Sequence, residues 1–136
     1  MGGAGSPSNK YTITADKSVY NMSSTVSVTI NGGAYTGHLL GSSSGTFEGC
    51  ARSSRCDETT CTHVNTNVVA DGTSFEWTPS ACETVTFRAM IHDQTSSSMY
   101  RTESITVTCE SAASRLMASV TILFFSALVS ISTVAL

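Results

Sequence analysis

Short runs of alternating apolar and polar residues recur along the first 109 residues of the chain. In the clearest run, 26–30, valine and isoleucine alternate with Ser27 and Thr29. An alternation with a period of two predicts a β-strand that buries one face. Similar runs predict further strands at 11–15, 35–40, 64–70, 75–77, 85–91 and 105–107.

Turn-forming residues separate these runs. Asn31-Gly32-Gly33 and Asp71-Gly72 favour turns, because glycine and asparagine readily adopt positive φ angles. No sustained helical period of apolar residues occurs before the C-terminal tail, so residues 1–109 are predicted to form one all-β domain. A two-sheet sandwich of about seven to eight strands fits this spacing, with residues 48–63 as an irregular loop. Its core is expected to contain Val28, Ile30, Phe75, Trp77 and Phe87.

The C-terminal residues 116–136 contain no charged side chain. As a helix, a tail of this length could span the hydrocarbon core of a bilayer. Small residues followed by a terminal apolar tail are also the signal for a glycosylphosphatidylinositol anchor, although the polar spacer here is short. Because no basic residue follows the tail, we expect the lipid anchor, attached at Ser111 in the linker 110–115, with a spanning helix as the alternative.

Charge and cysteine content narrow the class of protein. The net charge is −3 and the lysines and arginines are scattered, which excludes a nucleic-acid partner. Five cysteines in so short a chain indicate an oxidising compartment, and the sequon at Asn21 predicts glycosylation on a secretory route. The Gly/Ser-rich start has no apolar run. We therefore expect that a signal peptide and one partner cysteine are missing upstream.

Three patterns that can carry chemistry have simpler interpretations. Gly41–Gly45 has the G-x-S-x-G spacing around Ser43, but it lies in a loop between strands instead of a strand–turn–helix elbow. Cys56, Cys61 and His63 are close enough to suggest zinc, but the second pair of ligands is missing, so disulfides are preferred. His38 and His92 stand alone and are interpreted as ordinary strand residues. Neither catalytic activity, nor a metal, nor a cofactor is expected.

The odd number of cysteines leaves one without an intramolecular partner. Cys82 precedes one predicted strand and Cys109 closes the last, so these two are expected to meet at one end of the sandwich. Cys50 and Cys56 could join locally, which would leave Cys61 unpaired. Sequence alone does not decide among the possible arrangements.

Several segments, in order, resemble the reelin-domain (reeler) family. The matching segments are 11–21 with 25–30, Thr36–Leu40, Gly45–Phe47, Cys56 with Thr62–Asn65, Phe75–Pro79 and Val85–Ala89. The segment 36–40 departs from the family by lacking its Phe and the basic residue after it. The chain also starts without the cysteine that opens the family.

The resemblance implies an immunoglobulin-like, antiparallel sandwich that works outside the cell. It also implies that Cys56 pairs with the missing N-terminal cysteine, which leaves Cys50 to join Cys61; this arrangement is narrowly preferred. The expected function is recognition or adhesion at the cell surface, with extracellular proteins or glycans as partners. The alternatives are a defence protein that binds microbial surface components and, more distantly, a fragment of a ferric-reductase-like membrane protein.

Overall fold

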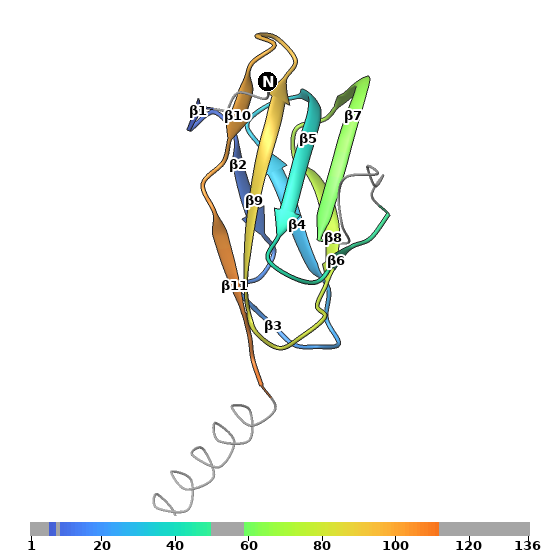
Figure 1. Cartoon of the computed structure of the whole chain (residues 1–136), viewed down its shortest axis with the longest axis vertical. Helices are drawn as coiled ribbons and strands as arrows, with labels where there is room; N and C mark the ends of the chain where they lie inside the picture. Colours follow the sequence, from blue (N-terminus) through green and yellow to red (C-terminus); the bar gives the residue numbers. More distant parts are fainter. Residues whose placement is uncertain (1–5, 8, 50–58, 112–136) are drawn as a thin grey trace, which may run out of the picture.

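The computed structural model describes residues 6–7, 9–49 and 59–111, which form two packed β-sheets and no helix (Figure 1). The smaller sheet has the order β2-β4-β8-β6. Its strands are β2 (Thr12–Ala15), β4 (Val26–Asn31), β6 (Thr46–Phe47) and β8 (Thr73–Thr78).

The larger sheet is built around one long strand, β9, which pairs along its length with three others. On one side lies β5, which in turn pairs with β7; on the other side lie β10 and β11, which continue to β1 and β3. The strands are β1 (Ser6–Pro7), β3 (Val19–Tyr20), β5 (Tyr35–Ser42), β7 (Thr60–Val69), β9 (Thr84–Asp93), β10 (Met99–Arg101) and β11 (Ile105–Cys109).

The all-β, two-sheet prediction is confirmed, and each of the seven predicted strands is present. The described residues also form four strands of two or three residues, β1, β3, β6 and β10, which are too short to show an alternating pattern. The sandwich was predicted to be antiparallel, and its longer strands pair in this way, but two pairs of short strands, β1 with β10 and β3 with β11, are parallel, so the larger sheet is mixed. The immunoglobulin-like label stays a prediction.

One boundary also differs from the prediction. Strand β7 begins at Thr60, inside the segment that was expected to be an irregular loop, because its first residues pair with Leu39–Gly41 of β5. Residues 50–58 of that loop and the apolar tail 116–136 lie outside the described residues. Within the described part, no helix is long and apolar enough to cross a membrane.

Trp77 is the largest side chain that is fully buried between the sheets. Its ring meets Tyr20 and Phe87 edge to face, with ring centroids 5.4 and 5.3 Å apart. Its indole N–H donates to the carbonyl oxygen of Ser44 at 2.9 Å, so the one polar atom of the ring is satisfied inside the core.

Four of the five residues predicted for the core are fully buried: Val28, Ile30, Trp77 and Phe87. Phe75 is only partly buried, so this part of the prediction is wrong. Its ring lies at the margin of the core, where it contacts the His38 ring in a tilted arrangement with centroids 4.6 Å apart.

Gly45 is required by the Trp77 ring. It has a φ of +82°, and a Cβ atom at this position would lie 2.3 Å from the indole. Gly41, near the end of β5, differs in this respect, because a Cβ atom there would meet nothing within 4 Å. The loop that carries Gly45 therefore closes over the tryptophan only without a side chain.

We expect Gly45→Ala to lower the free energy of unfolding by about 2–4 kcal/mol, because the ring must shift and the positive φ becomes strained. Gly41→Ala is the matched control and should change it by less than about 1 kcal/mol. Urea unfolding followed by tryptophan fluorescence measures both variants. Equal stabilities for the two would show that the loop does not close on the ring as described.

Candidate functional site

The outer faces of the two sheets differ in chemistry. Exposed or half-exposed positions of the smaller sheet are polar and mostly hydroxylated: Thr12, Thr14, Ser27, Thr29, Asn31, Ser74, Glu76 and Thr78. On the larger sheet, the outward positions of β5, β9 and β10 include, besides threonines, Leu39, Arg88, Met90, His92, Met99 and Arg101. We call these six residues the Leu39–Arg101 face.

Strand register places the six residues side by side. Met90 of β9 lies opposite Leu39 on one side and opposite Arg101 on the other. His92, two residues further, lies opposite Met99. Arg88, two residues before Met90, shares its side of β9, because side chains along a strand alternate between the faces. The face thus forms one continuous surface over three neighbouring strands.

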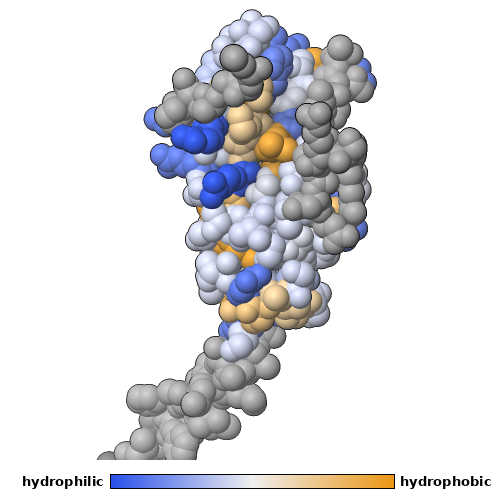
Figure 2. Space-filling view, viewed as in Figure 1, coloured by the Kyte–Doolittle hydropathy of each residue, from blue (hydrophilic) through white to orange (hydrophobic). Residues whose placement is uncertain are grey.

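Apolar side chains are exposed in the middle of this face. Leu39 and Met99 are each 38% exposed, and Met90 is partly exposed. Figure 2 shows apolar surface gathered over the upper part of β5, β9 and β10 and bordered by strongly hydrophilic surface. An apolar patch with a charged border is typical of surfaces that bind other molecules.

Both arginines of the face are exposed, and neither forms an ion pair with any described residue. No acidic residue occupies a described outward position of β5, β9 or β10. The acidic residue on the outer face of the smaller sheet, Glu76, projects from the opposite side of the sandwich. The Leu39–Arg101 face is therefore locally basic, although the whole chain has a net charge of −3.

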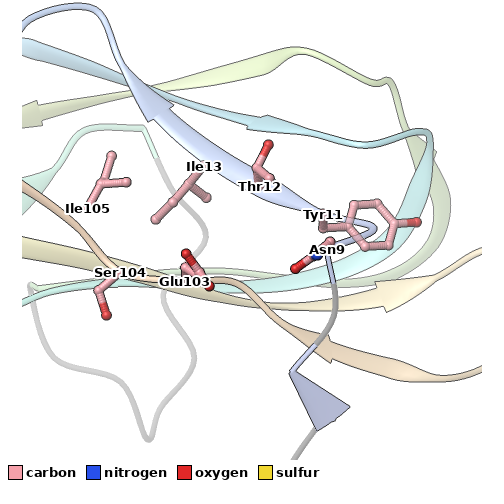
Figure 3. A pocket seen from close by; sticks show the side chains of 7 residues that line it. All are labelled: Asn9, Tyr11, Thr12, Ile13, Glu103, Ser104 and Ile105. Atoms are coloured by element: carbon pink, nitrogen blue, oxygen red, sulfur yellow. The ribbon is translucent and has the colours of Figure 1, made fainter.

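A groove of about 390 Å³ lies at the free edge of β2. Figure 3 shows Thr12 and Ile13 of β2 on one side and Glu103–Ile105 on the other, with Asn9 and Tyr11 nearby. Of these lining residues only Glu103 bears a formal charge, and none forms a nucleophile–base pair. The groove has the size of a small-ligand site.

Asp93 is the buried carboxylate that holds the N-terminal segment against the β9–β10 turn. It forms an ion pair with Lys10 and accepts hydrogen bonds from the Tyr11 hydroxyl, at 3.2 Å, and the Thr95 N–H, at 3.1 Å. The hydrogen bond from Lys10 lowers the pKa of Asp93 most, and the hydrogen bond from the Thr95 N–H lowers it further. Together they hold this pKa far below its usual range. Burial raises the pKa of the Tyr11 hydroxyl, and the neighbouring Asp93 charge raises it further.

The described cysteines form the disulfide expected at one end of the sandwich. Cys82 is bonded to Cys109, with Cα atoms 5.1 Å apart, which confirms this pair. Cys61 is also disulfide-bonded, so the arrangement that left it unpaired is wrong. Cys50 and Cys56 lie outside the described residues, and the choice between them as its partner stays open.

The other candidate residues are placed apart from one another. Asn21 lies in the turn after β3, where its side-chain oxygen accepts from the Ser23 hydroxyl at 2.7 Å. Ser111 is exposed and follows β11. Ser43 accepts a hydrogen bond from the Thr86 N–H at 3.1 Å, and it lies between strands, so no nucleophile elbow is formed.

Zinc was considered for Cys56, Cys61 and His63, with disulfides preferred; in the described part of the chain no group of three or more potential metal ligands is found. His38 is buried, with its Nε2 atom 3.6 Å from the Cys61 sulfur. His92 lies on the outer face, and its Nδ1 atom is 2.7 Å from the Thr36 hydroxyl. Cys56 and the side chain of His63 lie outside the described residues.

Sequence reasoning missed the Leu39–Arg101 face. One signal was present in the run 85–91, where Met90 is an apolar residue on the polar side of the alternation. The other members come from β5 and β10, and only the pairing of the strands brings them beside β9.

The fold is that of an all-β domain of two sheets, closed at one end by a disulfide. The Reeler domain model matches residues 2–115, so the chain belongs to the Reeler domain family and the resemblance seen in the sequence is confirmed. Against curated proteins the sequence gives no match.

Two solved structures show the same fold at low sequence identity. The Reelin-N domain of F-spondin superposes with a TM-score of 0.60 and 13% identity, covering 77% of this chain and 89% of that one. Fragment 2 of the human F-spondin reeler domain gives a TM-score of 0.58 and 13% identity, covering 75% of this chain and 93% of that one.

Because its pKa is lowered by folding, Asp93 stabilises the protein above the pKa of an unfolded aspartate, about 4, and this contribution is lost as the pH falls below it. Asp93→Asn should therefore lower stability at pH 7 and weaken the dependence of stability on pH between about 4 and 2. Urea melts across this range measure both effects. Glu76→Gln, on the exposed outer face of β8, is the control and should leave the pH dependence intact. The same pH dependence in Asp93→Asn and in the unmodified protein would contradict the role of the buried Asp93 carboxylate and its ion pair with Lys10.

Proposed function

We propose that this chain is an extracellular recognition module, tethered to the cell surface through its C-terminal residues and without catalytic activity of its own. The observation that carries the proposal is the Leu39–Arg101 face, which exposes apolar and basic side chains on a rigid sheet. Its partners are extracellular proteins or glycans. Recognition through a fixed surface of this kind needs no moving part and no reactive group.

An extracellular location is supported by the cysteines. The disulfide between Cys82 and Cys109 persists in an oxidising compartment and is rare in the cytosol. Asn21 lies in the turn between β3 and β4 and is partly exposed, and we infer that it is glycosylated.

The positions of the proposed glycan and tether agree with binding through the Leu39–Arg101 face. Tyr20, just before Asn21, pairs with Cys109 at the end of the larger sheet where β9 begins. Arg88 lies four residues after Thr84, the first residue of β9, and therefore about 13 Å from it along the strand. A glycan on Asn21 and an anchor on Ser111 would both occupy the disulfide-bonded end and leave the face open.

Expression of the chain behind a signal peptide tests the location and the tether. The protein should reach the outer surface of cells, and phosphatidylinositol-specific phospholipase should release it, as measured by flow cytometry. Asn21→Gln should reduce its mass by one glycan without reducing the amount at the surface.

A protein that resists the phospholipase, and whose mature form still contains residues 116–136 by mass spectrometry, would contradict the lipid anchor and support the spanning helix. Retention inside the cell in a reduced form would contradict the extracellular location.

A further inference from the structure

We propose that the Leu39–Arg101 face binds an extended, acidic segment of a partner protein, with two carboxylates that meet Arg88 and Arg101 and apolar side chains that cover Leu39, Met90 and Met99. This inference rests on the proposed recognition function and names the chemistry of its partner.

The two arginines define where negative charge is bound. Arg101 lies opposite Met90, and Arg88 is two residues from Met90 on the same side of β9. Arg88 and Arg101 are therefore diagonal neighbours across the two strands, with Cα atoms about 7–8 Å apart. A guanidinium binds a carboxylate through two parallel hydrogen bonds, and neither arginine is engaged in an ion pair with a described residue.

The spacing of the arginines suits an extended chain. Side chains two residues apart on the same side of a strand are separated by about 7 Å. Acidic residues at positions i and i+2 of an extended segment therefore match the separation of Arg88 and Arg101. A helical segment would instead place the side chains of residues i and i+2 on different sides.

The apolar half of the face favours a protein over a sulfated glycan. A glycan would satisfy the guanidinium groups but would leave Leu39 and Met99, each 38% exposed, without apolar cover. Methionine adapts its shape to different partners, and methionine and arginine are both enriched in protein interfaces. A segment that alternates acidic and apolar residues satisfies both halves of the face at once.

Binding of two peptide libraries to the purified full chain in detergent micelles tests the proposal. In one library, Asp or Glu at positions i and i+2 is flanked by Leu, Val or Phe; in the other, Asn or Gln replaces each acid. Fluorescence anisotropy should show binding of the acidic library, and the amide library should bind at least about tenfold more weakly, because the charge pairs are lost. A heparin hexasaccharide is the third probe and should bind more weakly than the acidic peptides.

Variants of the chain locate the site. Arg88→Gln and Arg101→Gln should each weaken binding of the acidic library about tenfold, and Leu39→Ser should weaken it by a similar factor. Lys17→Gln is the matched control, because it removes one positive charge from the turn between β2 and β3 and should leave affinity unchanged.

Three results would overturn the proposal. Tighter binding of heparin than of the acidic library would make the face a glycan site. Equal binding of the two libraries, or no binding of either, would exclude an acidic protein segment. Unchanged affinity in both arginine variants would place the site elsewhere. These measurements use purified protein, so their result does not depend on whether the surface location and the tether, which are tested in cells, are correct.

Discussion

The packing of Trp77 between the two sheets is the interaction on which the rest of the structure depends. Its ring contacts Tyr20 of β3 and Phe87 of β9, and its N–H is held by Ser44 in the loop between β5 and β6. These contacts join both sheets and fix the inward side of β9. Since side chains alternate along a strand, a buried Phe87 places Arg88 on the outer surface, and a shift of one residue would reverse both. The same packing that stabilises the core therefore also sets the outward side of β9 in the Leu39–Arg101 face.

Alternation of apolar and polar residues was sufficient to predict the long strands and most of the core, because burial of one face imposes this pattern on each strand separately. It failed where pairing between strands decides the outcome. Strand β3, with only Val19 and Tyr20, exists because it pairs with the end of β11. Likewise, Met90 was visible as an outward apolar residue, but nothing local in the sequence shows that Leu39 and Arg101 lie beside it.

Different interactions hold the two ends of β9 in place. Near Thr84, the bond between Cys82 and Cys109 links the loop before β9 to the end of β11. A crosslink of this loop length lowers the entropy of the unfolded chain and so raises its free energy by about 3–4 kcal/mol. Near the other end, Asp93 binds Lys10 and Tyr11 and so holds the N-terminal segment in place. The Leu39–Arg101 face lies between these two fixed points, so its side chains project from a sheet that is held at both ends. A preorganised surface loses less entropy when it binds a partner.

Nuclear magnetic resonance of methionine methyl groups tests whether one face of the larger sheet recognises a partner, because methionine side chains lie both on this face and away from it. Among the described residues, Met90 and Met99 lie on the face, whereas Met22 is exposed in the turn after β3 at the disulfide-bonded end. With ¹³C-labelled methionine and a saturating acidic, apolar peptide, the methyl signals of Met90 and Met99 should shift together while that of Met22 stays in place. A shift of Met22 with unchanged Met90 and Met99 signals would contradict recognition through the Leu39–Arg101 face.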